Sequence, residues 1–148
     1  MKIGIVTQSY YPRYGGVTEN VHHSATELRK RGHEVTILTI CHRSGEAENA
    51  PGVVRIGYNL MIPFNGAFVD LAVGVRLKAQ LRSLMRAYEF DLVHIHAPPV
   101  PTLPMLAIQA AECPKIGTFH TTGSPSRLFE WTRGMFAPIV DRLDARIA

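Results

Sequence analysis

The 148-residue chain lacks the features of a disulfide-stabilised, membrane-spanning or nucleic-acid-binding protein. Its only two cysteines, Cys41 and Cys113, form no C-x-x-C pair and are typical of free thiols in a reducing compartment. The opening apolar run is too short for a signal peptide, and no apolar stretch is long enough to cross a bilayer. The formal charge of +4 comes without a dense basic run interleaved with aromatic residues. We therefore expect a cytoplasmic protein, or one bound peripherally to the cytosolic face of a membrane, with no nucleic-acid partner.

Sequence motifs of several enzyme classes are also missing. Gly15-Gly16 lacks the G-x-G-x-x-G spacing and no acidic residue closes the following expected strand, which excludes an NAD site. There is no Ser/His/Asp arrangement for a nucleophile and no D-x-D motif for a metal-bound diphosphate. No carboxylate or thiol accompanies His94, His96 and His120 in the adjacent loops, so hydrogen-bonded, structural imidazoles are favoured over a metal site. A metal-dependent hydrolase built on these histidines stays as an alternative.

Short β-branched runs alternate with longer helical patterns, which predicts one α/β domain with a Rossmann-like parallel sheet and helices on both faces. The expected strands are residues 2–8, 34–40, 53–56, 92–96 and 115–119, with another beginning at residue 146. The expected helices are residues 17–31, 69–89, one ending near 113, and 128–143, and residues 57–68 are expected to form an apolar loop. Because the last expected strand begins where the sequence stops, we expect this chain to be a truncated part of a longer protein.

Three expected strands are followed by residues that could bind a ligand. Gly15-Gly16, His96 and His120 follow these strands, and ligands in open parallel sheets bind beyond the carboxyl ends of the strands. The glycine pair either lets an anion approach the N–H groups of a helix N-terminus or forms only a tight turn. His120 begins a loop of small hydroxyl residues, where it could bind a sugar hydroxyl, stabilise developing charge, or be structural.

The expected helix over residues 69–89 carries a basic stripe formed by Lys78, Arg82 and Arg86. Its expected buried side consists of Val73, Leu77, Leu81, Leu84 and Tyr88. A basic stripe beside the apolar segment 60–64 suits an anionic membrane surface. The alternative is a solvated helix face next to a loop that packs on the core.

Several segments together resemble family 4 glycosyltransferases. They are K-I-G-I-V-T-Q-S-Y-Y-P-R-Y-G-G-V at the start, R-G-H-E-V-T-I-L-T at 31–39, D-L-V-H-I-H-A-P at 91–98 and T-F-H-T at 118–121. They occur in the order of the family and extend over most of the chain. Within the family, I-P-F-N-G at 62–66 is most similar to the phosphatidylinositol α-mannosyltransferases.

The resemblance implies a GT-B fold, in which residues 1–148 form the N-terminal, acceptor-side lobe and an absent C-terminal lobe binds most of the sugar nucleotide. It implies retaining transfer of a hexose, such as mannose, from a nucleoside diphosphate sugar (GDP-mannose or a UDP-hexose) to a lipid or glycan hydroxyl. No metal or other cofactor is implied. By motif, His120 would be catalytic. The implied donor-binding residues are Gly15, Gly16 and Thr121, and the implied acceptor-binding residues are Tyr11, Phe64, Asn65 and Arg127.

The sequence departs from the mannosyltransferase pattern in two places. The basic residue expected shortly after the Asn-Gly pair is Asp70, and the lysine expected after the histidine is Pro125, with Arg127 nearby. Both departures remove positive charge where a lipid phosphate would lie. Separately, a non-catalytic lipid- or glycan-binding module stays as the alternative from another functional class.

Overall fold

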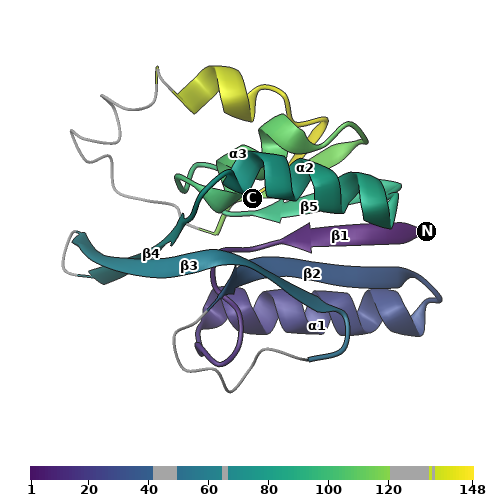
Figure 1. Ribbon diagram of the computed structural model, residues 1–148. Helices are drawn as coiled ribbons and strands as arrows, with labels where there is room; N and C mark the ends of the chain where they lie inside the picture. The colour runs from purple at the N-terminus through teal and green to yellow at the C-terminus, as the bar shows by residue number, and fades with distance from the viewer. Residues whose placement is uncertain (42–49, 65–66, 121–133, 135) are drawn as a thin grey trace.

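The computed structural model describes the chain except for residues 42–49, 65–66, 121–133 and 135. Its centre is a seven-stranded sheet with the order β4-β3-β2-β1-β5-β6-β7 (Figure 1). All neighbouring strands are parallel except β3 and β4, which are antiparallel. The strands are β1 (Lys2–Val6), β2 (Glu34–Cys41), β3 (Val53–Phe64), β4 (Ala67–Val73), β5 (Leu92–His96), β6 (Lys115–Thr118) and β7 (Ala145–Ile147).

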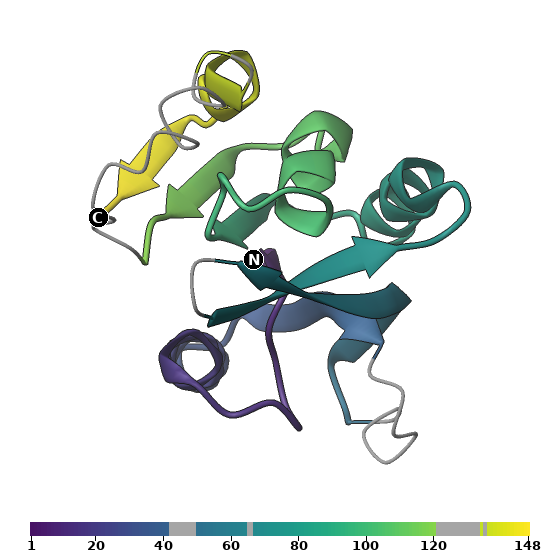
Figure 2. The same ribbon diagram turned by 90° about the vertical axis from the view of Figure 1, so that its left-hand side faces the viewer.

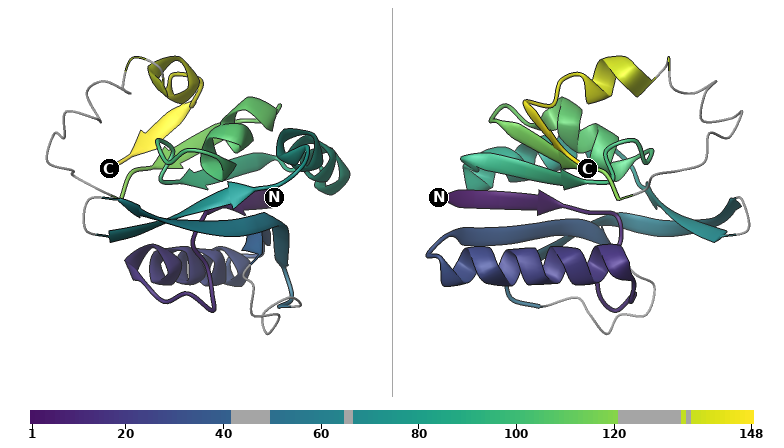
Figure 3. Two further views of the ribbon diagram at one scale, coloured as in Figure 1. Left: turned by 60° about the vertical axis from the view of Figure 1, so that its left-hand side comes forward. Right: turned by 180° about the vertical axis from the view of Figure 1, so that it is seen from behind.

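Helices cover both faces of the sheet, as the sequence predicted (Figure 3). The helix α1 (Gly16–Lys30) lies on one face, and α2 (Leu77–Tyr88), α3 (Leu103–Ala110) and helical residues 136–140 lie on the other. The end of α1 follows the predicted stop signal, because Gly32 adopts a positive φ of 83° that few other residues tolerate. Of the helix expected over 128–143, residues 128–133 and 135 lie outside the described residues, and residues 136–140 are helical as predicted.

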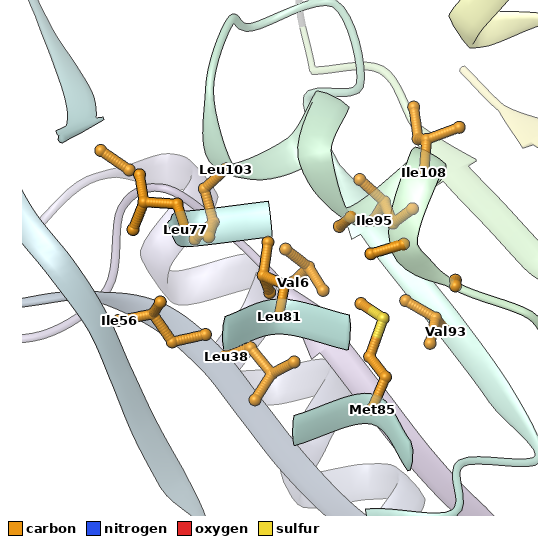
Figure 4. Packing of buried hydrophobic residues seen from close by; sticks show 14 of the residues in the cluster. Val6, Leu38, Ile56, Leu77, Leu81, Met85, Val93, Ile95, Leu103 and Ile108 are labelled. Carbon is orange, nitrogen blue, oxygen red and sulfur yellow. The ribbon is translucent and has the colours of Figure 1, made fainter. Parts of the chain in front are cut away.

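Two apolar cores lie on the two faces of the sheet. Ile3 and Ile5 of β1 pack with Val21 and Ala25 of α1. The next strand position, Val6, belongs to the opposite core, which includes the buried side chains of α2 and α3 (Figure 4). This alternation follows from the two-residue period of a strand. Burying each such aliphatic side chain contributes about 1.5–3 kcal/mol to folding.

The expected apolar loop over residues 57–68 is instead part of an antiparallel hairpin. The strand β3 continues to Phe64, and β4 pairs back along it from Phe64↔Ala67 to Tyr58↔Val73. A strand partner satisfies the backbone groups that a loop would leave to water, and this favours the hairpin. At its base, Gly57 has a φ of +65° and lies against Val73, a close approach that only glycine permits.

The helix predicted from residue 69 therefore begins only at Leu77. Leu77 and Leu81 are buried as predicted, and Met85 is buried with them. Val73 lies on β4 rather than on the helix, and Tyr88 is exposed, so both assignments to the buried side of the helix were wrong. The strand predicted to begin at residue 146 is confirmed as β7, which pairs with β6.

The sheet reverses its strand order at β1, which lies between β2 and β5. Open α/β sheets bind ligands at such a reversal, beyond the carboxyl ends of the strands. Figure 2 looks onto this edge, where β1, β5 and β6 end near the start of α1. An open hollow of about 460 Å³ lies at the opposite edge of the sheet, lined by Met1, Lys2, Gly32, Glu34, Glu89 and Asp91.

Candidate functional site

Gly15 and Gly16 join the loop after β1 to the first turn of α1. Gly15 is the N-cap residue with extended backbone angles, and Gly16 is the first helical residue. Neither has a positive φ in the range that favours glycine, and a Cβ added to either would meet no atom within 4 Å. The described fold therefore does not require glycine here, in contrast to a tight turn. What the pair provides is open access to the N–H groups that a helix N-terminus leaves unsatisfied.

The structure brings His94, His96 and His120 together where β5 and β6 end. The rings of His94 and His96 lie on the same face of β5 with centroids 4.4 Å apart. His120 follows β6 and stacks on His96, with Nε2 at 2.7 Å from Nδ1 of His96. His94 bonds through Nε2 to the hydroxyl of Thr118 at 2.7 Å. These are the hydrogen-bonded imidazoles that the sequence favoured.

The three imidazoles are held in the neutral form. Burial, together with the neighbouring His94 and His120, lowers the pKa of His96 to about 3. Burial also lowers the pKa values of His94 and His120. Nδ1 of His96 and Nε2 of His120 face each other across a hydrogen bond and do not point toward a common position that a metal ion could occupy. Among the described residues, no cluster of three or more His, Cys, Asp or Glu side chains could hold a metal ion.

Asp70 is the position where the resemblance led us to expect a cation, and its side chain is almost fully buried in β4. Its Oδ1 accepts hydrogen bonds from Arg13 at 2.6 Å and from Asn59 at 2.9 Å. The amide of Gln8, at the end of β1, donates to the backbone oxygen of Asp70. The Ser9 hydroxyl also faces the carboxylate, at 3.4 Å. This cluster ties the loop before Gly15-Gly16 to the β3–β4 hairpin.

Sequence reasoning missed the role of Arg13. We took Asp70 as a loss of positive charge, but the structure places a cation, Arg13, directly against it. The signal in the sequence was an arginine just before the glycine pair, 57 residues away from its partner. No spacing rule links residues that far apart.

Tyr11, a predicted acceptor-binding residue, is engaged within the chain. Its hydroxyl donates to Glu19 at 2.6 Å, and this hydrogen bond raises the pKa of Tyr11 to about 12. Its ring makes edge contacts with Tyr10, Tyr14 and His22. Phe64 ends β3, whereas Asn65, Thr121, Pro125 and Arg127 lie outside the described residues.

The basic stripe of Lys78, Arg82 and Arg86 is exposed on α2, as predicted. Two of its members also reach residues beside α2: Lys78 donates to Gln109 at 2.8 Å, and Arg86 pairs with Glu112 at 2.7 Å. In β3, Leu60 and Met61 are about half exposed, which contradicts a loop packed on the core. No helix in the described part of the chain is long and apolar enough to cross a membrane.

The family model for Glycosyltransferase Family 4 matches residues 14–148. The phosphatidyl-myo-inositol mannosyltransferase of Mycolicibacterium smegmatis is 35% identical over all of this chain and 38% of its own length. The protein of the same name from Mycobacterium tuberculosis is 32% identical over the whole chain and 39% of its own length. The alpha-monoglucosyldiacylglycerol synthase of Streptococcus pneumoniae is 30% identical over 82% of the chain and 27% of its own length. The chain thus spans about two fifths of the length of the mannosyltransferases that it matches.

Two solved structures share the fold over 98% of the chain, each with a TM-score of 0.59 and 15% sequence identity. They are MurG of Acinetobacter baumannii and the sucrose-phosphate synthase of Thermosynechococcus elongatus, and the match covers 40% and 41% of their chains. Both are GT-B glycosyltransferases, so the Rossmann-like fold predicted from the sequence is that of part of a GT-B enzyme. With a family model that matches nearly the whole chain and relatives up to 35% identical, this chain belongs to Glycosyltransferase Family 4.

Proposed function

We propose that this chain is the N-terminal, acceptor-side lobe of a retaining glycosyltransferase. The enzyme would move a hexose, such as mannose, from a nucleoside diphosphate sugar to a hydroxyl of a lipid or glycan. The donor would lie between this lobe and a C-terminal lobe that binds most of the nucleotide. Since a sugar nucleotide then needs both walls of the cleft, residues 1–148 alone are expected to be inactive.

The observation that carries the proposal is the open glycine pair. Gly15 and Gly16 have no conformational or packing requirement within the described residues, and they start a helix of 15 residues. A bound diphosphate would supply the missing reason for glycine, because its oxygens approach the backbone N–H groups closely. These N–H groups, with cations of the second lobe, would stabilise the leaving diphosphate. Thr121 is a further proposed donor contact.

His120 would lie at the transferred sugar, where a neutral imidazole can orient a hydroxyl and ease oxocarbenium-like charge in the transition state. The sequence offers no carboxylate pair at a spacing that would indicate double displacement through a covalent intermediate. Retention would therefore depend on how the lobe holds donor and acceptor on the same side of the sugar. No metal or cofactor is needed for this role.

The acceptor is proposed to lie beside the β3–β4 hairpin, contacted by Tyr11, Phe64, Asn65 and Arg127. The names of the relatives support a lipid acceptor, since they refer to phosphatidyl-myo-inositol and to a diacylglycerol. The exposed apolar residues Leu60 and Met61, together with the basic stripe on α2, would then rest on an anionic, cytosolic membrane surface.

The test is a screen of the full-length protein that contains this chain, with GDP- and UDP-sugars against phosphatidylinositol and simpler glycolipids. Transfer from GDP-mannose to phosphatidylinositol would show that Asp70 and Pro125 are tolerated, and transfer to another lipid would show that they alter the acceptor. The Gly16→Ala variant should fold normally and lose donor affinity. Absence of transfer with every donor would overturn the proposal in favour of a lipid- or glycan-binding module.

A further inference from the structure

His96 is the most buried member of the histidine cluster, with only 1% of its surface exposed. Its Nδ1 lies 2.7 Å from Nε2 of His120, so one proton is shared between these two nitrogens. Its other nitrogen, Nε2, is buried and has no hydrogen-bond partner in the described part of the chain. This combination restricts where the protons of both rings can be.

A neutral imidazole has one N–H and one lone pair, which leaves two arrangements of the pair. If His120 donates from Nε2, then His96 must accept at Nδ1 and carry its own proton on the buried, unpartnered Nε2. If His96 donates from Nδ1, then its Nε2 carries only a lone pair. Buried N–H groups without a partner are rarer in proteins than buried acceptors without one. The second arrangement is therefore the one that the burial of His96 favours.

We propose that His96 is a positioning residue that donates its Nδ1–H to Nε2 of His120 and thereby holds His120 as the Nδ1–H tautomer. The lone pair of His120 is then occupied by His96, and its Nδ1–H is the group that remains for a ligand. His120 is only partly buried, and in this proposal its Nδ1–H donates to an oxygen of the transferred sugar. In this arrangement His120 is a hydrogen-bond donor and is not the base that takes the proton of the acceptor hydroxyl.

The neutral state that this bond needs is consistent with the surroundings of both rings. An imidazolium has no lone pair and could not accept at Nε2 of His120. Burial lowers the pKa values of both His96 and His120, so both rings stay neutral near pH 7. In the adjacent His94, Nε2 is bonded to Thr118 and not to either of these two rings.

The tautomers can be measured in the 148-residue chain without any substrate. Long-range ¹H–¹⁵N correlation spectra of the ¹⁵N-histidine-labelled chain distinguish a protonated from an unprotonated ring nitrogen. We expect a protonated Nδ1 and an unprotonated Nε2 on both His96 and His120, with the signals assigned through a His96→Asn variant. A protonated Nε2 on His120 would overturn the proposal, whatever the activity of the enzyme.

The consequence for turnover rests on the proposed function and is tested in the full-length protein. His96→Leu removes the donor, whereas His96→Asn keeps an amide N–H near the position of Nδ1. We expect His96→Leu to lower kcat roughly tenfold to a hundredfold with little change in KM, as for other supporting residues behind a functional histidine. His96→Asn should keep most of the kcat of the unmodified protein.

The matched control is Thr118→Val, which breaks the neighbouring hydrogen bond between β5 and β6 and leaves His96 and His120 in place. Its kcat should stay near that of the unmodified protein. Equal losses in Thr118→Val and His96→Leu would indicate a merely structural role and overturn the proposal. A protein that transfers no sugar at all would remove the proposed function but leave the spectroscopic result unaffected.

Discussion

Arg13 and Asp70 form an ion pair at 2.6 Å between the loop after β1 and the central part of β4. The Asp70 side chain is 2% exposed and the Arg13 side chain is 34% exposed, so the pair extends from the protein interior to the surface. It connects the segment proposed to bind the donor with the hairpin proposed to lie beside the acceptor. A change at one of these residues should therefore affect both segments.

The first prediction concerns the stability that Asp70 provides. Asp70→Ala leaves the donors on Arg13 and Asn59 without their buried acceptor, and this should lower the free energy of unfolding by about 1–3 kcal/mol. Urea denaturation of the chain measures the change. The control is Glu27→Gln, which breaks an exposed ion pair with Lys30 and should leave the unfolding midpoint unchanged. Equal midpoints for all three proteins would contradict the prediction.

A second prediction separates the glycines that the fold needs from those that it does not. In Gly57→Ala the new Cβ would lie 2.6 Å from Leu77 and 2.7 Å from the Val73 carbonyl, at a positive φ. We expect a loss of about 1–3 kcal/mol in the free energy of unfolding. Gly16→Ala introduces the same methyl group into open space and should unfold at the same urea concentration as the unmodified chain. A large loss in Gly16→Ala would mean that the fold itself requires that glycine.

The third prediction tests His120 in the full-length protein. His120→Ala should lower kcat about a hundredfold or more, because the contact with the sugar would strengthen in the transition state. The thermal unfolding midpoint should fall only by the amount that the loss of the hydrogen bond with His96 explains, and the variant should stay folded. Steady-state transfer assays and calorimetry on the same preparation measure both quantities. Turnover close to that of the unmodified enzyme would rule out the assigned role.

The fourth prediction is a dependence of stability on pH. The pKa of His96 is about 3 in the folded chain and near 6.5 when unperturbed, so between these values the unfolded state binds the proton more tightly. The free energy of unfolding should therefore fall as the pH is lowered below about 6.5, with a slope of up to about 1.4 kcal/mol per pH unit from this group. His94 and His120 add to the slope in the same direction.

Urea denaturation between about pH 7 and about pH 4 tests this dependence. His96→Asn should flatten the profile. Parallel profiles for His96→Asn and the unmodified chain would show that His96 does not contribute.

The last prediction concerns the basic stripe on α2. Lys78 and Arg86 are each bonded to a neighbouring side chain, whereas Arg82 makes no ion pair or hydrogen bond with the described residues. Arg82→Glu should weaken binding to vesicles that contain anionic phospholipid on the order of tenfold, because it reverses one charge at the surface. Lys30→Glu makes the same charge change on α1, on the opposite face of the sheet. Sedimentation with vesicles that shows equal losses for both variants would contradict a specific role for the stripe.

The parts of the fold that were predictable from the sequence are those in which the spacing of apolar residues fits only a helix or only a strand. The runs of β1, β2 and β5 are short and rich in apolar and β-branched residues, and α1 has an apolar stripe and a clear stop at Gly32. The β3–β4 hairpin was missed because Val69, Val73 and Leu77 also fit the spacing of a helix. Val69 and Val73 form a strand because they pair with β3, and the local sequence pattern contains no sign of that pairing.

The candidate site divides in the same way. The meeting of His96 and His120 was predictable, because the ends of neighbouring parallel strands meet at one edge of a sheet. The Arg13–Asp70 pair was not, since it depends on how far a hairpin extends and on a contact across 57 residues. The direction of the hydrogen bond between His96 and His120 requires burial and distance, and a sequence contains neither.

The place of β1 in the sheet has a consequence for how the protein is made. β1 can pair with β2 as soon as β2 has left the ribosome, but its other neighbour, β5, begins only at Leu92, about fifty residues after the end of β2. At typical rates of synthesis the second edge of β1 stays unpaired for several seconds, about 3–10 s. Unpaired apolar edges are templates for aggregation. The central strand of the finished sheet is thus an edge strand for much of its translation, and the nascent chain exposes an unpaired strand edge during that interval.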